Sequence, residues 1–569
     1  METRALIALA LSFAIFMVFM YVGEKQRQKS VMESPPSQVA EAEKPVAVKP
    51  EPPVSRAPSP PMAVHPKPAA PSQRPSKDVV VDTPLYRAVF TENGALLKSF
   101  RLKKYRESMP FETIYAWSLG PIGLEIERYQ DPDKVGIKPK ELVKPGRSQE
   151  LPLGLSWEGE NLSLSPPIFY EADRHEVSLQ GEATAAVQFK AVTPEGFVVT
   201  KTFKFRGDSY GFELVVKVAN QGPHTMEGHL DLALTANFAG VNPGAAGFLG
   251  FNGSINQRLD DVKVGKLKEL KTFTGKIDWA GLDEGYFLMA AVPQSAPKCI
   301  LTLKESPPEF MTATLRNPET LVPGQEVQHS YILYFGPKEL RALQALNIGL
   351  ERVVNFGWFD FFAKPMLYVL NFIDRYVHNY GWSLIIFTLL TRLVLFYPNH
   401  RAYKSMKEMQ KLQPKVAKIR EKYKDDREAM NKELMALYRT FKVNPLGGCL
   451  PMALQLPIFI ALYNVLSYAI ELRHTPFIPT LPFTDIVWLA DLSAKDPLLI
   501  TPLVMGATMV IQQKMTPSPG DPAQAKMMMF LPIVFTFLFL NFASGLVIYW
   551  LINNVLSIIQ QAFTNKYLA

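Results

Sequence analysis

Cysteine is scarce in this chain of 569 residues: only Cys299 and Cys449 occur, and they lie far apart. Two such cysteines provide no disulfide framework, no CxxC redox motif and no metal cluster. The phosphate-binding pattern GxxxxGK[ST] is also absent, so the sequence has no motif for a nucleotide-driven machine. His175, His224 and His229 have neither metal-ligand spacing nor a nucleophile pattern nearby. We therefore expect no metal, no cofactor and no enzymatic activity.

Acidic residues are missing from the interior of the long apolar stretches, although one of these stretches contains an arginine. This is Arg392, in the segment GWSLIIFTLLTRLVLFY at 381–397. A charge at bilayer depth costs at least about 2.5–3.5 kcal/mol on insertion scales, so such residues usually face protein or water and mark a site. Its possible partners are water, backbone carbonyl groups or a group that arrives from outside. The simpler alternative is an arginine whose head group snorkels to the interface.

Six apolar segments suggest membrane spans. The first, Ala5–Val22, is an 18-residue run broken only by Ser12. It has no small-x-small cleavage site, so an uncleaved anchor over 1–23 is favoured over a signal peptide. Several spans are short, because sixteen residues rise only about 24 Å against a hydrocarbon core of about 30 Å, and local thinning of the bilayer is expected. The other five spans are predicted at 381–397, 447–470, 498–513, 527–542 and 546–563.

The region between the first two spans divides into a tether and a large soluble domain. Residues 31–78 contain 13 prolines, so 24–78 is predicted to be an extended linker rather than a folded unit, with a Pro-rich recognition motif as the alternative. Residues 79–345 show period-two patterns without a long helical period, which predicts an all-β sandwich. Asn93–Gly94 and Gly207–Asp208 are hairpin signals within it.

Residues 350–377 are rich in aromatic side chains on one side, with charged residues elsewhere. This pattern predicts an amphipathic helix lying in the membrane interface. A buried helix that packs on the β domain is the alternative.

The loop at 398–446 is strongly basic, with 13 Lys or Arg and six Asp or Glu. Apolar residues recur at helical spacing on both sides of a polar turn at 424–426, which predicts a helical hairpin. Such a hairpin could bind ribosomal RNA, anionic lipid or acidic proteins, or it could be simply a solvated charged surface. The candidate cations are Lys415, Lys418, Arg420, Lys422 and Lys424.

The same loop sets the predicted topology. The positive-inside rule places it in the cytoplasm, so both termini are cytoplasmic and the β domain lies outside. Lys25, Arg27 and Lys29 after the first span argue the other way, but the larger cluster is expected to decide.

Polar residues form stripes along several spans. They share a helix face at i, i+3, i+4 or i+7 spacing, and such residues prefer a bundle interior. We expect several stripes to surround Arg392 as a wet groove, although ordinary interhelical hydrogen bonds would explain isolated members. The stripes are Thr388 with Arg392; Asn464, Ser467, Tyr468 and Glu471; Thr501, Thr508 and Gln512; and Tyr549, Asn553, Ser557 and Gln560.

Two runs resemble the YidC/Oxa/Alb family of membrane protein insertases. They are QPKVAKIREKYKDDREAMNKELMALYRTFKVNPLGGCLPMALQLPIFIALY at 413–463 and ASGLVIYWLINNVLSIIQQ at 543–561, and the junction NPLGGCLP is the most specific part. The anchor, linker and β domain resemble the Gram-negative arrangement. The resemblance implies a polytopic α-helical inner-membrane protein with six spans and a five-helix core. It also implies a periplasmic supersandwich domain similar to sugar-mutarotase folds and largely dispensable for insertion.

The resemblance also implies roles and partners. Arg392 matches the groove arginine, with Thr388 beside it, and Gln455 fits a polar groove position. Tyr549 and Trp550 fall at an aromatic pair associated with substrate contact, where Trp550 replaces the commoner tyrosine. The implied partners are nascent membrane proteins, the Sec translocon (SecYEG, SecDF), membrane lipid, and the ribosome through the hairpin; DNA is not among them. Asn553 and Gln512 are added to the candidate groove from their stripes.

Two other functions fit parts of the sequence. A small-anion transporter could use Arg392 as its binding charge, but the C-terminal spans show no inverted repeat. An envelope glycan-binding protein could act through the β domain. Deletion of residues 79–330 separates this second function from insertion.

Overall fold

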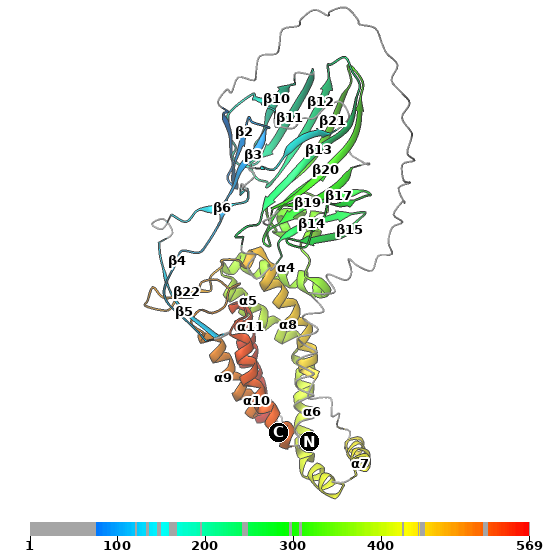
Figure 1. Ribbon diagram of the computed structural model, residues 1–569. Helices are drawn as coiled ribbons and strands as arrows, with labels where there is room; N and C mark the ends of the chain where they lie inside the picture. Colours follow the sequence, from blue (N-terminus) through cyan, green and yellow to red (C-terminus); the bar gives the residue numbers. More distant parts are fainter. Residues whose placement is uncertain are drawn as a thin grey trace, which may run out of the picture.

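The computed structural model describes residues 76–119, 122–131, 136–144, 150–158, 168–193, 196–241, 248–294, 299–306, 310–423, 426–441, 443, 450–515 and 522–567. The anchor predicted at 1–23, the linker up to residue 75 and Lys424 lie outside these ranges. In Figure 1 the β domain and the basic helices α6 and α7 lie at opposite ends of the other helices.

Three sheets form most of the domain between Asp78 and Pro337. One has the order β6 (Pro139–Glu141), β3 (Leu96–Arg106), β2 (Tyr86–Thr91), β1 (Asp78–Asp82), β9 (Glu176–Ser178). The largest has the order β15 (Arg258–Lys263), β14 (Gly250–Ile255), β17 (Ile277–Asp283), β18 (Phe287–Pro293), β21 (Glu326–Pro337), β12 (Gly211–Asn220), β11 (Phe197–Arg206), β10 (Thr184–Val192), β8 (Glu171–Ala172). The third has the order β16 (Lys271–Phe273), β19 (Ile300–Ser306), β20 (Phe310–Leu321), β13 (Met226–Asn237), β7 (Gly154–Glu158). A domain built mainly of β-sheets is thus confirmed, with the short helix α3 (Leu340–Ala345) following it.

Both predicted hairpins are confirmed. β2 and β3 pair antiparallel around Asn93–Gly94, where Gly94 has a φ of 76° that glycine adopts without steric cost. β11 and β12 pair antiparallel around Gly207–Asp208. Alternate residues of β11 are buried, as the period-two pattern requires.

Lys201 of β11 is fully buried in the core of this domain. Its Nζ donates hydrogen bonds to the carbonyl oxygens of Gly94 at 3.0 Å, Ala95 at 2.9 Å and Leu153 at 2.7 Å. The side chain therefore ties the β2–β3 turn to the segment before β7.

Replacement of Lys201 by methionine keeps most of the buried volume but leaves three carbonyl groups without their donor. We expect the free energy of unfolding to fall by about 2–3 kcal/mol, within the usual cost of leaving buried polar groups unsatisfied. Lys204→Met is the matched control, because Lys204 on the same strand makes only a partly exposed ion pair with Glu213. Calorimetry of the purified chain measures the difference, and equal unfolding temperatures for the two variants would contradict the expectation.

The C-terminal half is helical. Its elements are η2 (Leu350–Val353), η3 (Gly357–Phe359), α4 (Asp360–Val377), α5 (Tyr380–Val394), α6 (Phe396–Lys422), α7 (Arg427–Thr440), α8 (Leu450–Tyr468), η5 (Ile470–Leu472), α9 (Ile500–Met515), α10 (Pro522–Phe539) and α11 (Ser544–Tyr567). The span predicted at 381–397 runs over parts of two helices that meet at a bend. α5 ends at Val394, and α6 leaves it at 60° from Phe396 onward.

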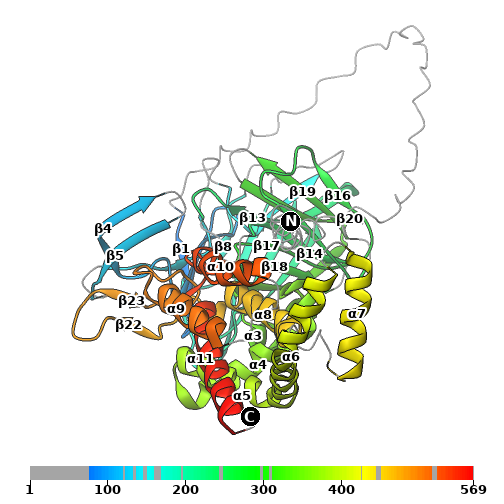
Figure 2. The ribbon, with the colours of Figure 1, turned by 90° about the horizontal axis from the view of Figure 1, so that it is seen from below.

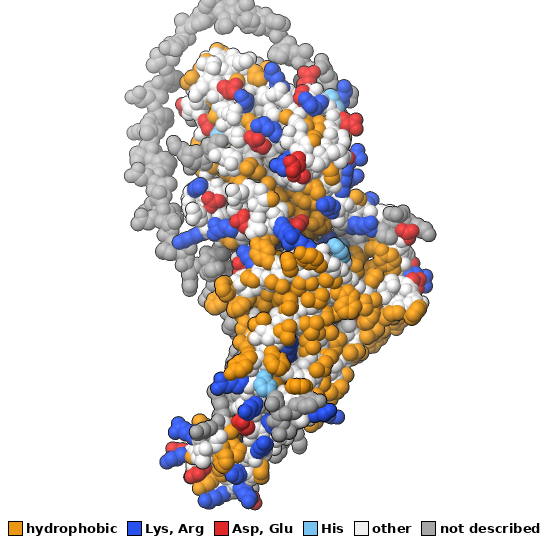
Figure 3. Space-filling model, turned by 180° about the vertical axis from the view of Figure 1, so that it is seen from behind, with side chains coloured by type: hydrophobic (Ala, Val, Ile, Leu, Met, Phe, Trp, Pro, Cys, Tyr) orange, Lys and Arg blue, Asp and Glu red, His pale blue; other side chains and the backbone are white. Residues whose placement is uncertain are grey.

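Within the described ranges, one helix is long and apolar enough to cross a bilayer unaided, the 21 residues Ser544–Thr564. α5 and α6 together form a bent candidate, and Leu454–Tyr468 and Met528–Phe539 are shorter apolar helices. Exposed apolar side chains gather over this part of the molecule, and Figure 3 shows them as a belt across one face. The belt includes Leu393 and Val394 of α5, Leu503 and Val504 of α9, Met529, Phe530 and Phe537 of α10, and Ile559 and Phe563 of α11.

α4 has two unlike faces. Met366, Leu367 and Leu370 are buried, where the helix packs against α5 and α8. Phe361 is 81% exposed and Tyr376 is 74% exposed on the other side. The helix therefore combines a packed face with an uncovered aromatic face.

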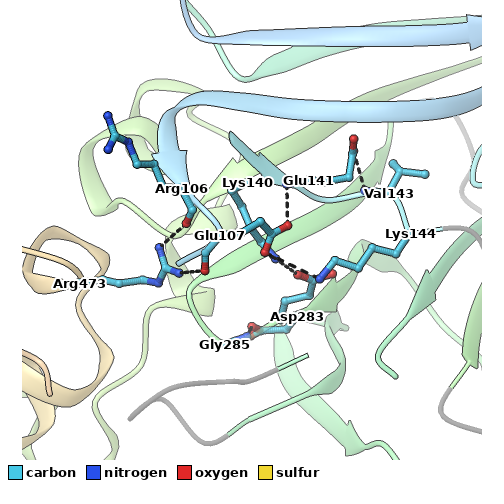
Figure 4. A network of polar contacts seen from close by, with 10 residues as sticks. Arg106, Glu107, Lys140, Glu141, Val143, Lys144, Asp283, Gly285 and Arg473 are labelled. Atoms are coloured by element: carbon cyan, nitrogen blue, oxygen red, sulfur yellow. Dashed lines mark hydrogen bonds and ion pairs between the residues drawn. The ribbon is translucent and has the colours of Figure 1, made fainter. Parts of the chain in front are cut away.

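The β domain is fastened to the end of α8. The Tyr286 hydroxyl donates to the Ser467 carbonyl oxygen at 3.0 Å. Arg473 donates to the carbonyl oxygens of Arg106 at 3.2 Å and Glu107 at 3.4 Å, as Figure 4 shows. Behind these bonds, Lys140 Nζ lies 2.8 Å from Glu284 in a buried ion pair. We call these contacts the junction.

Glu471 lies at the junction rather than on the polar face of the third span. α8 ends at Tyr468, and Glu471 belongs to η5, so the predicted i+7 position on a continuous helix is wrong. Burial raises the pKa of its carboxyl group to about 7, and its Oε1 has no hydrogen-bond partner among the described residues.

Glu471→Gln should stabilise the junction in a pH-dependent manner. The raised pKa means that the folded protein binds this proton more tightly than the unfolded chain, so stability falls as pH rises from about 4.5 to about 7. The variant should gain nothing near pH 4.5 and on the order of 3 kcal/mol above pH 7, relative to the natural chain. Thermal unfolding at several pH values measures this, with exposed Glu227→Gln as control. A gain that does not vary with pH would contradict the assignment.

Candidate functional site

The candidate site is built on α5. Asn379 caps this helix, since its side chain accepts a hydrogen bond from the Trp382 amide. Thr388 is buried and donates to the Leu384 carbonyl oxygen at 2.7 Å, so its hydroxyl is satisfied within its own helix. Arg392 follows one turn later, in the last turn before the bend.

Arg392 reaches from α5 to α11. Its Nη2 donates to the Asn553 carbonyl oxygen at 2.9 Å and also to the Ser557 hydroxyl. Ser557 in turn donates to the same Asn553 carbonyl oxygen at 2.7 Å, and the Tyr403 hydroxyl of α6 interacts with the guanidinium. Over the part of the chain that the structure describes, no ion pair involves Arg392, and its buried Nε has no partner. The charge is thus held by neutral oxygen atoms, as the absence of acidic residues from the spans predicted.

Gln455 and Tyr549 bridge α8 and α11. Gln455 Nε2 donates to the Tyr549 hydroxyl, and the tyrosine is almost completely buried. Trp550 points elsewhere, with ring centroids 5.0 Å from Phe459, 5.3 Å from Phe539 and 6.0 Å from Phe535. The predicted aromatic pair therefore separates into a tyrosine on the polar bridge and a tryptophan in an aromatic cluster.

Asn464, Ser467 and Thr508 of the remaining polar stripes have hydrogen-bond partners other than Arg392. Asn464 donates to the Phe356 carbonyl oxygen at 2.9 Å, and the Ser467 carbonyl oxygen accepts from the β domain. These two residues of the third-span stripe therefore make their contacts on the side of the junction. On α9, Thr508 accepts from Asn554 of α11 at 3.3 Å. The structure places Gln512 half-buried on α9, which packs against α10 and α11. Asn553 and Ser557 of α11 thus lie beside Arg392, whereas Asn464 and Ser467 of α8 do not contact it, and the wet groove itself stays a prediction.

Tyr403 and Asn554 were missed as site residues by reasoning from the sequence. Tyr403 has a helical apolar spacing that marks it as part of the hairpin. The bend between α5 and α6 brings the Tyr403 side chain next to Arg392, and the local spacing does not predict this bend. Asn554 lies next to Asn553 of the polar stripe on α11, and this position is the feature of the sequence that could have indicated its role.

The basic helices α6 and α7 lie side by side. Lys415 Nζ lies 4.0 Å from the centroid of the Phe441 ring, a cation–π contact that joins the two helices. Lys418 and Lys422 are exposed, and Arg420 is half-buried. The α7 N-terminus is capped by Asp426, whose side chain accepts from the Ala429 amide at 3.0 Å. Lys415 is exposed as well, and Lys422 Nζ lies 5.0 Å from the centroid of the Tyr423 ring.

These features define a class: an integral membrane protein whose apolar helices connect a large extramembrane β domain to a basic helical extension. The model of the family described as 60Kd inner membrane protein matches residues 372–569, and that of the YidC periplasmic domain matches residues 123–369. The membrane protein insertase YidC of Syntrophus aciditrophicus is 41% identical over 498 residues, which cover 86% of this chain and 85% of that protein. That of Geobacter metallireducens is 39% identical over 578 residues, covering 100% and 99%. The chain belongs to the YidC family of membrane protein insertases, and it is an inner-membrane protein with a periplasmic domain.

Two solved structures are similar at lower identity. A crystal structure of an active YidC insertase is 18% identical and covers 87% of this chain and 93% of its own, with a TM-score of 0.35. A putative aldose 1-epimerase from Escherichia coli K12 is 9% identical and covers 46% and 99%, with a TM-score of 0.29.

Proposed function

We propose that this protein inserts integral inner-membrane proteins into the bilayer and helps them fold, alone or with the Sec translocon. The names of its relatives support this function. The observation that carries the mechanism is Arg392, a cation between α5 and α11 that is bound to Asn553, Ser557 and Tyr403 through neutral atoms. A charge bound in this way can still attract an acidic segment that arrives from outside.

The mechanism follows from the cost of moving polar chain through lipid. A polar or acidic segment costs several kcal/mol to move through hydrocarbon. We propose a hydrated groove beside Arg392, open to the cytoplasm and to lipid, with the bridge between Gln455 and Tyr549 as its inner limit. Of the other predicted groove residues, Asn553 provides a carbonyl oxygen to Arg392, and we assign Thr388, Trp550 and Gln512 to the groove on the family resemblance and their helix faces. The apolar segment of the client then enters lipid, and its burial drives insertion at about 25 cal/mol per Å².

The proposed topology has six spans, of which the last five form the core, with both termini in the cytoplasm. The apolar belt and the opposite placement of the β domain and the helices α6 and α7 support it (Figure 1). Because the β domain is periplasmic, α6 and α7 then lie in the cytoplasm, as the positive-inside rule requires. The aromatic face of α4 would lie in the periplasmic interface.

The proposed partners are nascent membrane proteins, the Sec translocon (SecYEG, SecDF) and lipid. Contact with the ribosome is proposed through the exposed cations Lys418 and Lys422. No partner in this proposal requires a bound cofactor.

A reconstituted system tests the proposal directly. The purified chain in liposomes without other proteins is given a small client during its translation, and protease protection of the translocated segment is scored. Protection above that in empty liposomes establishes autonomous insertion. Protection equal to that in empty liposomes contradicts it and favours a role that depends on the Sec translocon or on small-anion transport. Deletion of residues 79–330 should leave protection intact, whereas a glycan-binding protein would lose its activity.

A further inference from the structure

A two-stranded ribbon projects from the β domain toward the helices. It consists of β4 (Phe111–Leu119) and β5 (Ile122–Tyr129), which pair with each other outside the three large sheets. In Figures 1 and 2 the ribbon lies apart from those sheets, near β22 and β23. An isolated two-stranded ribbon is marginally stable in water, so this one needs a covering surface.

One face of the ribbon is apolar. Tyr115 pairs with Ile126 and Trp117 pairs with Leu124. Directly opposed residues and residues two apart in a strand share one face, so these four side chains lie together. Tyr115 is 51% exposed and Trp117 is 47% exposed, so the β4 half of this face remains largely accessible.

The other face is polar and is fastened to the chain just before α9. Glu125, which pairs with Ala116 on this face, accepts an ion-pair hydrogen bond from Lys495 Nζ at 2.9 Å. The Glu125 amide also donates to the Pro497 carbonyl oxygen at 3.1 Å. Pro497 lies three residues before Ile500, where α9 begins. These bonds fix the ribbon beside the end of α9 at which the apolar belt starts, with Leu503 and Val504 exposed.

A further exposed aromatic residue lies on the neighbouring hairpin, which consists of β22 (Ile478–Thr480) and β23 (Val487–Leu489). Phe483, in the loop between these strands, is fully exposed and has a φ of 66°. A bulky residue with a positive φ is strained, so the loop keeps the Phe483 ring exposed at a cost in backbone conformational energy. Arg128 of β5 forms an ion pair with Asp485 at 2.9 Å, which joins the two hairpins.

We propose that the apolar face of the β4–β5 ribbon docks on the periplasmic leaflet of the bilayer beside α9, with Phe483 as a second anchor. Three features favour lipid over a protein partner. The ribbon is bonded to the segment just before α9, where the exposed Leu503 and Val504 of the belt lie. The face consists of aromatic and aliphatic side chains, and it contains tryptophan and tyrosine, which favour the membrane interface. The proposal rests on the periplasmic location of the β domain and on the proposed membrane crossing of α9, but not on insertase activity.

Fluorescent labels on adjacent residues test the docking. In the full chain with Cys299→Ala and Cys449→Ala, Trp117→Cys places an environment-sensitive NBD label on the apolar face. Ser118→Cys, one residue away on the opposite face, is the matched control. Both variants are reconstituted in phosphatidylethanolamine–phosphatidylglycerol liposomes with nitroxide lipids. We expect the label at 117 to emit at shorter wavelength and to be quenched severalfold more by nitroxide lipid than the label at 118. Aqueous iodide should quench the label at 118 more strongly.

Three results would overturn the proposal. Equal quenching by nitroxide lipid at both positions means that the face does not select lipid. Strong iodide quenching at 117 means that the face is in water. Protection at 117 from both quenchers means that protein covers it. A label introduced by Phe483→Cys should behave as at 117, and this position keeps the test valid if Trp117→Cys fails to fold. Client insertion is scored in the same liposomes, so loss of insertion with retained lipid quenching refutes the proposed function and leaves the docking intact.

Discussion

Arg392→Ala is expected to reduce insertion of a client with an acidic translocated segment by at least about tenfold, which corresponds to 1.4 kcal/mol. Two unit charges about 4 Å apart attract by about 4 kcal/mol at an effective dielectric constant of 20, and water in the groove reduces this to a fraction. Because the described residues give Arg392 no carboxylate partner, its charge remains available to a client. Protease protection in proteoliposomes measures the effect.

Three comparisons separate charge from hydration at this site. Arg392→Lys should retain most of the activity, since it keeps the charge. A client whose translocated segment is neutral should lose much less than the acidic client. Ser557→Ala removes one neutral contact of the guanidinium without removing the charge, so its effect should be small for both clients. An equal loss for acidic and neutral clients with Arg392→Ala would exclude electrostatic attraction and leave hydration as the role of this residue.

The double variant Lys418→Glu, Lys422→Glu should weaken binding to ribosomes by at least about 30-fold at low salt, because loss of two cations at about 1 kcal/mol each gives this factor and the two new carboxylates add repulsion. Both side chains are exposed, and ribosomal RNA is densely anionic. Binding of the natural chain should fall steeply with salt because counterions are released, and the variant should show a shallower slope. Co-sedimentation with ribosomes over a salt series measures both quantities.

Two further variants test whether the effect of this charge reversal depends on the position of the cations and on the packing of α6 against α7. Lys204→Glu changes an exposed cation of the β domain, at the opposite end of the molecule from α6 and α7 (Figure 1), and should leave ribosome binding unchanged. Lys415→Ala should weaken binding by a different route, because Lys415 contacts the Phe441 ring and joins α6 to α7. Unchanged binding after the Lys418 and Lys422 reversal would show that these helices are only a solvated charged surface.

Local signals in the sequence predicted much of the fold. Asn93–Gly94 and Gly207–Asp208 mark hairpins because turn chemistry is local and the flanking alternation fixes the register. Arg392 was recognisable because a cation in an apolar segment is costly in any arrangement of helices. Its carbonyl partner was among the three partners considered, since acidic residues are absent from the spans.

The features that could not be predicted from the sequence depend on contacts between residues far apart in the chain. The third-span stripe was misassigned because the Ser467 carbonyl oxygen accepts from Tyr286, 181 residues earlier in the chain. Such a contact leaves no trace in local periodicity. The bend after Val394 was missed because apolarity continues through Phe396 and Tyr397, and hydrophobicity alone does not mark a change of direction. The β4–β5 ribbon has ordinary strand alternation, and only its pairing outside the large sheets reveals it as a separate arm.

α8 contacts different parts of the molecule at its two ends. At one end, the Ser467 carbonyl oxygen accepts from Tyr286 of the β domain, and Arg473, which follows the helix, donates to the same domain. Toward the other end, Gln455 of the same helix holds Tyr549 of α11. α8 therefore links the hydrogen bond to the β domain at Ser467 with the polar bridge at Gln455 within one helix, and Pro457 lies between these two contacts.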